Sequence, residues 1–320
     1  MSLITLADIE AARARIAAHV RPTPMVVMNP CRLALKAENL QPIGAFKLRG
    51  AFNALLSLPP EVRAKGVIAH SSGNHAQAVA YAAARLGVPA TIVMPADAPA
   101  PKIAGVRRER AEIVPVGSSG NERARVAREL AAERGLALIE PFDMSEILCG
   151  TGTIGLEILE QAPDVRTVFA PVSGGGLLGG LAAAIKLSRP GVRVIGVEPE
   201  LANDAFQSFR AGHVVAISAE QATSTICDGL RVQQLGARTW PHIQAFVDDI
   251  ITVSEDQVRG AMRAIAGEAR LIAEPSGAAA TAGALASGAD LATSVAVVSG
   301  GNVDPQFYAG VLGDASEVRR

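Results

Sequence analysis

The stretch GVIAHSSGNHAQAVAYAAARLGVPATIVMP, residues 66–95, decides the fold. Its apolar runs VIAH and ATIVMP are typical of short buried strands, and the small residues between them are typical of a helix. Two strands joined by a helix pair in parallel, because the helix carries the chain back across the sheet. This unit therefore predicts a parallel sheet covered by helices.

The same alternation extends on both sides of this stretch. A strand is expected at residues 33–38, and a second series of strands and helices begins near residue 146. We therefore predict an α/β fold with two lobes, each a mostly parallel twisted sheet flanked by helices. Residues 66–140 would form a small domain, and residues 1–57 and 141–320 a large one.

Composition narrows the class of protein. The chain has 320 residues, with 30 basic and 31 acidic side chains and a net charge of −1. This balance lacks the basic footprint of a nucleic-acid-binding protein or of one that binds an anionic membrane. The sequence also lacks a window of about 18 uncharged apolar residues that would span a membrane. Small molecules are therefore the expected partners.

The cysteines and the N-terminus indicate a compartment. Cys31, Cys149 and Cys227 lie far apart and form no CxxC pair, so neither a disulfide framework nor a structural zinc site is expected. The first 20 residues carry charges within a helical pattern and do not resemble a signal peptide. We expect a protein of the reducing cytoplasm.

One lysine has unusual neighbours in PIGAFKLRG, residues 42–50. Lys47 lies among glycines and apolar residues. Such surroundings disfavour the ammonium form and leave an amine that can attack a carbonyl carbon. The alternative is a solvated lysine at the start of a helix. Lys47 is the first candidate for covalent chemistry.

A glycine-rich loop, SGGGLLGG at residues 173–180, follows an apolar strand and opens a helix. Its backbone amides and the helix N-terminus would bind an anion such as phosphate. The loop also satisfies G-x-G-x-x-G, and Glu198 ends the next strand, so a nicotinamide dinucleotide is a second interpretation. Close packing of the backbone is a third.

Two further loops follow predicted strands. SSGNH at residues 71–75 offers hydroxyls, a side-chain amide and free backbone amides, which suit a carboxylate. A serine there could equally cap a helix. SGGN at residues 299–302 either completes a site or forms only a turn. All these loops lie where ligands bind in open α/β sheets, beyond the carboxyl ends of the strands.

The motifs RPTP, GAFKLRG, SSGNH, SGGGLLGG and SGGNVD, in this order, resemble one family. They are similar to pyridoxal phosphate (PLP) enzymes of the tryptophan synthase β-like fold, fold type II, in the serine/threonine dehydratase and serine racemase branch. The resemblance covers the chain from about residue 21 to residue 304. It implies that fold, PLP as cofactor, an amino acid as substrate and a homodimer.

Matching the motifs implies roles for the residues that would bind the cofactor. Lys47 would hold the cofactor as an imine and, once displaced by substrate, remove the α-proton. Phe46 would flank the cofactor ring, Asn74 would bond its phenolic oxygen, and the glycine loop would bind its phosphate. The full implied set is Phe46, Lys47, Asn74, Gly174, Gly175, Gly176, Leu177 and Ser299.

Two serines bear on the type of reaction. Ser299 would face the pyridine nitrogen, and a neutral partner there makes the ring a weaker electron sink, which favours β-elimination or racemisation over transamination. By the resemblance, Ser72 would act as acid and base on the face opposite Lys47 during racemisation. Ser72 could instead only cap a helix.

The resemblance also implies substrate contacts. Ser71 and the backbone amide of His75 would hold the substrate carboxylate. Arg123 would reach a substrate carboxyl group, or would be solvated on a charged helix. Arg231 is a candidate for binding a second carboxylate, which raises 3-hydroxyaspartate as a substrate, although a solvated arginine is equally consistent. His70, like most remaining histidines, is expected to be an ordinary surface or packing residue.

The segment VEPELAND matches a divalent-cation site of the racemase-like branch. Glu198, Asp204 and the carbonyl of Ala202 would supply hard oxygen ligands for Mg²⁺ or Ca²⁺. The alternative is a solvated acidic loop.

These features together predict a PLP-dependent ammonia-lyase that eliminates the β-hydroxyl of L-threonine or L-serine to give a 2-oxo acid and ammonia. Serine racemase and threo-3-hydroxyaspartate dehydratase are the nearest alternatives. An NAD-dependent dehydrogenase would use the glycine loop and Glu198 but leaves Lys47 unexplained. A non-catalytic ligand-binding protein is a further alternative.

Overall fold

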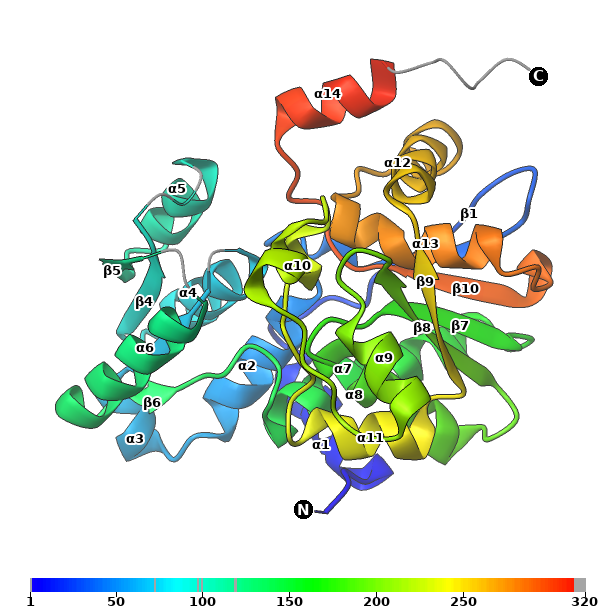
Figure 1. The fold of residues 1–320 in the computed structure, drawn as a ribbon. Coiled ribbons are helices and arrows are strands. Elements are labelled where there is room, and N and C mark those ends of the chain that lie inside the picture. The colour runs from blue at the N-terminus through cyan, green and yellow to red at the C-terminus, as the bar shows by residue number, and fades with distance from the viewer. Residues whose placement is uncertain (1, 72, 97, 99, 118–119, 314–320) are drawn as a thin grey trace.

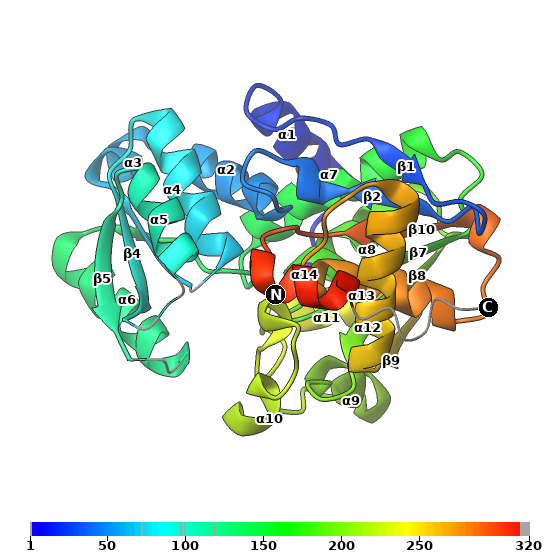
Figure 2. The same cartoon turned by 90° about the horizontal axis from the view of Figure 1, so that it is seen from above.

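The chain folds into two sheets, each in its own lobe. The computed structural model describes residues 2–71, 73–96, 98, 100–117 and 120–313. Figures 1 and 2 show the smaller sheet with its helices on one side of the molecule and the larger sheet on the other. The predicted α/β class, with two mostly parallel sheets flanked by helices, is confirmed.

The larger sheet has six strands, and its neighbours are parallel except for the first pair, β1 and β2, which is antiparallel. In spatial order the strands are β1 (Met25–Val27), β2 (Ala34–Ala37), β10 (Ser294–Val298), β7 (Thr167–Pro171), β8 (Arg193–Pro199) and β9 (Asp249–Val253).

The smaller sheet has four strands, all parallel. In spatial order they are β5 (Glu112–Val116), β4 (Ala90–Pro95), β3 (Val67–His70) and β6 (Ala137–Leu138).

Helices separate most of the strands along the chain. Their bounds are α1 (Leu6–Ile16), α2 (Lys47–Ser57), α3 (Pro60–Lys65), α4 (Asn74–Leu86), α5 (Ala100–Arg108), α6 (Gly120–Arg134), α7 (Ser145–Gln161), α8 (Gly176–Ser188), α9 (Asp204–Ala211), α10 (Ala219–Thr223), α11 (Thr239–Phe246), α12 (Glu255–Ala264), α13 (Pro275–Ala286) and α14 (Pro305–Gly313).

Both faces of the larger sheet are buried, as a parallel sheet requires. Along β7, Val168 and Ala170 pack into the core shared with α7, α8 and α11. Phe169, between them, packs into the core shared with α12 and α13. This alternation explains why the strands read as continuous apolar runs.

The predicted helices and strands occur with shifted ends. The strand expected at 33–38 is β2, Ala34–Ala37, and α7 begins at Ser145, beside the expected start of the second series near residue 146. Helices α9, α10 and α11 lie within residues 204–246, for which the sequence predicted no element. Their ends depend on contacts with the rest of the large lobe, which local pattern does not report.

A buried group of charges anchors the start of α2. The Arg49 guanidinium donates to Glu38 and to Glu157, at distances of 2.6–2.9 Å between nitrogen and oxygen. Lys36 Nζ lies 2.6 Å from Glu157 Oε2, and both cations are fully buried. The charges of two cations and two carboxylates therefore balance one another. One of the cations, Arg49, lies two residues after Lys47 in the chain.

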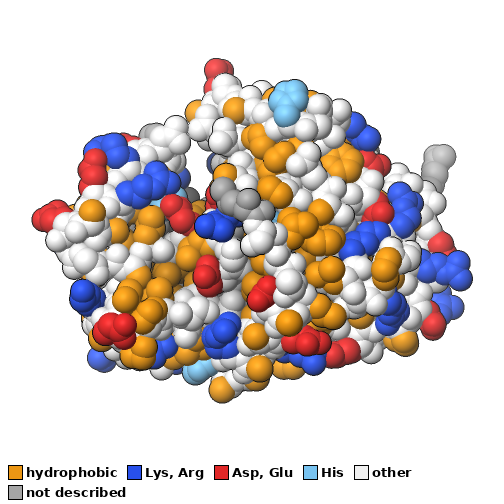
Figure 3. Space-filling model, turned by 90° about the horizontal axis from the view of Figure 1, so that it is seen from below, with side chains coloured by type: hydrophobic (Ala, Val, Ile, Leu, Met, Phe, Trp, Pro, Cys, Tyr) orange, Lys and Arg blue, Asp and Glu red, His pale blue; other side chains and the backbone are white. Residues whose placement is uncertain are grey.

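The surface agrees with the near-neutral charge. Figure 3 shows basic and acidic side chains interspersed over one face of the molecule. Within the described part of the chain, no helix is both long and apolar enough to cross a membrane. Cys31, Cys149 and Cys227 are free thiols, as the sequence predicted.

Candidate active site

A cavity of about 790 Å³ lies between the two lobes. Its wall includes Ser71 at the carboxyl end of β3 in the small sheet, and Ser173 and Ser299 beyond β7 and β10 in the large one. The carboxyl ends of strands from both sheets thus face one space, where ligands bind in such folds.

The structure brings most of the predicted cofactor and substrate residues to this cavity. Gly175 is the N-cap of α8, between two lining residues, and Ser72 lies outside the described residues. The predicted residues that line the cavity are Phe46, Lys47, Ser71, Asn74, His75, Arg123, Gly174, Gly176, Leu177 and Ser299.

Lys47 is the first residue of α2, and its amine is held at the cavity wall. Nζ donates to the carbonyl oxygen of Pro141 at 2.6 Å and lies 5.2 Å from the centre of the Phe46 ring. Burial lowers the pKa of Lys47 to about 8, because the ammonium form loses its hydration. Roughly a tenth to a fifth of the amine is therefore neutral near physiological pH, and this fraction can act as a nucleophile or a base.

The glycine loop fits a phosphate group. Helix α8 starts at Gly176, and the first amides of a helix have no partner within it. A Cβ atom on Gly174 would lie 2.5 Å from the Phe142 ring, and one on Gly175, whose φ is +87°, would lie 2.9 Å from Thr239. Close packing therefore requires glycine at these positions and leaves the helix N-terminus open to an anion.

Asn74 is fixed by two residues that sequence reasoning did not place near it. Its Nδ2 donates to Glu274 Oε1 at 2.6 Å, and its Oδ1 accepts from Asn302 Nδ2 at 2.8 Å. Asn302 also donates to the carbonyl of Ile43, four residues before Lys47. These bonds connect the SSGNH loop, the SGGN loop and the segment that carries the lysine.

His75 is buried, and its ring is turned to the backbone. Nε2 lies 3.0 Å from the carbonyl oxygen of Ile139, so this nitrogen carries the proton and donates. Burial, and next the charge of Lys47, lowers the pKa of His75 to about 3. The ring is therefore neutral, and only the backbone amide of His75 is suited to an anion.

Ser299 follows β10 and is almost fully buried. Its hydroxyl lies 3.5 Å from the carbonyl oxygen of Ser276, at the N-terminus of α13. Because the group is neutral, it would leave an aromatic nitrogen beside it unprotonated.

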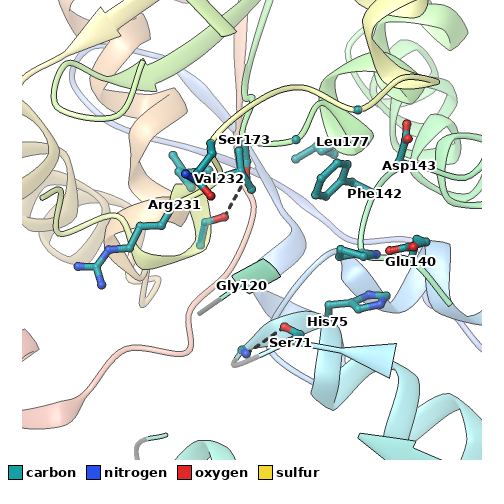
Figure 4. Close-up of a pocket in the computed structure, with 18 of the residues that line it drawn as sticks. Ser71, His75, Gly120, Glu140, Phe142, Asp143, Ser173, Leu177, Arg231 and Val232 are labelled. Atoms are coloured by element: carbon teal, nitrogen blue, oxygen red, sulfur yellow. Dashed lines mark hydrogen bonds between the residues drawn. The ribbon is translucent and has the colours of Figure 1, made fainter. Parts of the chain in front are cut away.

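Sequence reasoning missed one ionised group in the wall. His70 Nε2 lies 2.9 Å from Glu140 Oε2, and Arg128 donates to Glu140 Oε1 at 3.2 Å. All three line the cavity, although His70 was expected to be an ordinary histidine. Figure 4 shows Glu140 close to His75. The only sequence signal is its position just after the short strand β6.

Arg231 lines the cavity with part of its side chain, but its charge is directed elsewhere. The guanidinium donates twice to the carbonyl oxygen of Thr225, at 3.0 and 2.5 Å. Figure 4 shows the side chain extending away from Phe142 and His75. Its predicted use for a second substrate carboxylate has no support in this arrangement.

The predicted metal residues lie apart from the cavity. Glu198 and Asp204 are fully buried, yet Glu198 Oε1 and both carboxylate oxygens of Asp204 have no hydrogen-bond partner within the described chain. Burial and the nearby Asp204 charge raise the pKa of Glu198 well above its usual range. Burial raises the pKa of Asp204 to about 7. Buried oxygens without donors fit a cation site.

Comparison with known proteins agrees with this geometry. Residues 16–300 match the family model described as pyridoxal-phosphate dependent enzyme. The chain is 42% identical to L-threo-3-hydroxyaspartate ammonia-lyase of Saccharomyces cerevisiae, over 98% of this chain and 97% of that protein. It is 39% identical to the catabolic L-threonine dehydratase of Staphylococcus aureus, over 97% of this chain and 92% of that one.

Comparison with a solved structure supports the same family. Maize serine racemase superposes with a TM-score of 0.91 at 38% identity, covering 98% of both chains. The fold and cavity define a PLP enzyme of fold type II.

The chain belongs to the pyridoxal-phosphate dependent enzyme family, and within it to the lyases. The dinucleotide interpretation of the glycine loop is therefore wrong. Its acidic residue, Glu198, is fully buried and does not line the cavity, so it is not placed to bind a ribose.

Proposed function

We propose that this enzyme eliminates the β-hydroxyl group of L-threonine or L-serine and releases a 2-oxo acid and ammonia. The observation that carries the proposal is the half-buried Lys47 amine, which faces a cavity that also contains an anion cradle and a serine-rich turn. Relatives named as ammonia-lyases and dehydratases, at about 40% identity, support the same reaction class.

The residues that would hold PLP follow from the fit of the cavity. Gly174 to Leu177 would bind the phosphate, Phe46 and Asn74 would position the ring, and Ser299 would face its nitrogen. When bound, PLP supplies an electrophilic carbon for amines and a conjugated ring that withdraws electrons from the substrate Cα.

Lys47 would move the α-proton. With a pKa of about 8, its neutral form can accept a proton from Cα near physiological pH. The bond from Nζ to the Pro141 carbonyl orients the amine at the cavity wall. The β-hydroxyl then takes a proton and leaves as water, which forms the Cα–Cβ double bond. The released enamine would tautomerise and hydrolyse to the 2-oxo acid and ammonia.

The turn after β3 would bind the substrate carboxylate. Ser71 already accepts a bond from the amide of Gly73 at 3.1 Å, which shapes the turn. The backbone amide of His75 lies at the start of α4, where the helix dipole favours an anion. Held there, the substrate would be oriented with Cα toward Lys47.

Serine racemisation is the second candidate activity. It is supported by 38% identity to a serine racemase across nearly the whole chain. The candidate for the second acid and base, Ser72, lies outside the described residues. Formation of D-serine from L-serine by the wild-type enzyme, and its loss in Ser72→Ala, would establish this activity.

A divalent cation would be held by Glu198, Asp204 and the carbonyl of Ala202. The buried carboxylate oxygens without donors support this assignment, and Mg²⁺ and Ca²⁺ both take oxygen ligands. Because none of these three residues lines the cavity, the cation would stabilise the loop after β8 and would not contact the substrate.

We further propose a domain division, an assembly and a compartment. Residues 66–140 would form the small domain, and residues 1–57 and 141–320 the large one, with the cavity between them. A homodimer is supported by the family, and the cytoplasm by three free cysteines.

The test is a spectrum combined with a product assay. The purified protein with PLP is expected to absorb near roughly 410 nm, to lose this band on borohydride treatment, and to release 2-oxo acid from L-threonine or L-serine. A protein that binds PLP but yields neither oxo acid nor D-serine would contradict the proposed function.

A further inference from the structure

The charged groups of the cavity wall differ in what they bind. Asp143 accepts from the amides of Ala237, Arg238 and Thr239 and so caps α11. Glu274 accepts from Asn74. Glu140, in contrast, lies between the His70 imidazole and the Arg128 guanidinium, and both of these residues line the cavity.

The two partners of Glu140 differ in their exposure to solvent and in their distance from its carboxylate. The His70 side chain is 13% exposed and meets Glu140 at 2.9 Å. The Arg128 side chain is 60% exposed and meets it at 3.2 Å. The hydrogen bond and the charge interaction with His70, followed by the charge of Arg128, hold the pKa of Glu140 below its usual range despite burial. Glu140 is therefore an anion at physiological pH, and its guanidinium partner is largely exposed to solvent.

Glu140 is also close to the groups that would hold the substrate. The next residue, Pro141, accepts the bond from Lys47 Nζ, and the preceding residue, Ile139, accepts from His75. His70 directly precedes Ser71 of the proposed carboxylate turn. A substrate held by that turn with Cα near Lys47 would therefore extend its side chain into the space that Glu140 faces.

We propose that Glu140 excludes a second carboxylate from this pocket, so that the enzyme selects 3-hydroxy amino acids with one carboxylate, such as L-threonine and L-serine, over 3-hydroxyaspartate. A second carboxylate would meet the like charge of Glu140 in a partly desolvated space and would have to compete with it for Arg128. A substrate with a methyl group or a hydrogen on Cβ carries no second charge. It is therefore neither repelled by Glu140 nor required to compete with it for Arg128. This inference rests on the proposed function.

The test compares kcat/KM for L-threo-3-hydroxyaspartate with that for L-threonine, measured by 2-oxo acid release at one pH and salt concentration. In Glu140→Gln, which keeps the shape and removes the charge, this ratio is expected to rise at least about tenfold, because like charges in contact cost this much or more. A general loss of activity affects both substrates and cancels in the ratio.

Two further variants make the test specific. Arg128→Gln is expected to move the ratio in the opposite direction, since it leaves Glu140 without its exposed cation. Glu129→Gln is the matched control, because Glu129 is a neighbouring exposed glutamate on α6 that pairs with Arg125. Its ratio should equal that of the wild type.

The outcomes separate this inference from the proposed function. An active wild-type enzyme that prefers hydroxyaspartate, or a Glu140→Gln ratio equal to that of Glu129→Gln, would overturn the role of Glu140 while leaving the ammonia-lyase intact. A wild-type enzyme that binds PLP and releases oxo acid from neither substrate would overturn the proposed function itself.

Discussion

Two groups of buried carboxylates in this protein are balanced in different ways. Glu38 and Glu157 are surrounded by Arg49, Lys36 and hydroxyl donors, so their charges are satisfied within the chain. Glu198 and Asp204 are equally buried and leave three oxygens without a donor among the described residues. Because an unbalanced buried charge is costly, the first group is suited to stabilise the fold, and the second is consistent with the proposed cation site.

Lys47 belongs with the unbalanced group. Within the described chain its amine contacts a carbonyl oxygen, and burial alone lowers its pKa, whereas Arg49, two residues later, contacts two carboxylates. The comparison therefore divides the buried charges into those that hold the fold and those available for chemistry or cation binding.

The largest expected effect is on activity. Lys47→Ala should lower turnover by at least about 10³-fold and abolish the band removed by borohydride, because both the covalent attachment and the base are lost. Single-turnover kinetics and absorption spectra measure the two. Lys65→Ala, at an exposed position, is the control and should match the wild type. Near-normal turnover in Lys47→Ala would place this lysine among the structural charges.

The next largest effect is on stability. Arg49→Met would leave Glu38 and Glu157 with Lys36 as their one remaining buried cation and should cost about 3–5 kcal/mol of unfolding free energy. Urea denaturation measures the loss, and Arg49→Lys should lose less because it keeps the charge. If Arg49→Met unfolds at the same urea concentration as the wild type, the balanced group contributes little to the fold.

The unbalanced carboxylates should respond to cations and pH. The folded pKa of Asp204, about 7, lies above its ordinary value of 3.8, so in the metal-free protein its stabilising contribution is full below about pH 4 and is lost as the pH rises through 7. Mg²⁺ or Ca²⁺ should therefore raise the melting temperature by several degrees at pH 8 and much less at pH 5.

The variant Asp204→Asn tests whether Asp204 is responsible for the response to cations and pH. The variant should lose the cation response and, in EDTA at pH 8, should melt at a higher temperature than the wild type, because it no longer buries a second negative charge. Differential scanning calorimetry measures both. An equal cation response in the variant would remove Asp204 from the proposed site.

A smaller effect concerns the capture of cofactor. Because only the neutral amine attacks a carbonyl carbon, and the pKa of Lys47 is about 8, the rate of PLP capture by the apoprotein should rise roughly tenfold between pH 7 and pH 9 and then level off. Stopped-flow absorption at several pH values measures this rate. A rate that keeps rising beyond pH 10 would mean that Lys47 has an ordinary pKa.

The smallest effect is expected at an exposed ion pair. Arg13 and Glu160 form a salt bridge with side chains 47% and 61% exposed. Arg13→Ala should change the unfolding free energy by less than about 1 kcal/mol, because water and salt screen the pair. Urea denaturation of Arg13→Ala and Arg49→Met under the same conditions compares the two losses of unfolding free energy. A loss as large as that of Arg49→Met would show that burial does not separate the two kinds of pair.

Local pattern predicted the parts of this protein that depend on neighbours in sequence. The apolar runs at 67–70, 90–95 and 193–198 form strands, because burial on both faces of a sheet requires consecutive apolar residues. The glycine loop opens α8, because the start of a helix is marked by residues that are neighbours in sequence. Helices α9 to α11 were missed because contacts made far along the chain determine their ends.

The site was predictable to the same extent. Lys47, the SSGNH turn and the glycine loop are motifs with local chemical meaning, and the structure gathers their described residues at one cavity. Glu274 and Glu140 have no motif. They contact Asn74 and His70 across 200 and 70 residues, and a lone glutamate has no sequence signature that distinguishes it from a solvated one.

By itself, the sequence determined the two-lobed α/β class, the family and the choice of Lys47 as the candidate lysine, because each depends on periodicity or on motifs of a few residues. Tertiary structure alone decided which charges are balanced. It placed Arg49 against Glu38 and Glu157, directed Arg231 to a backbone carbonyl, and set Glu140 in the cavity wall. The reason is physical: the state of a buried charge depends on its distance to other charges and on its loss of water, and both are properties of the folded chain.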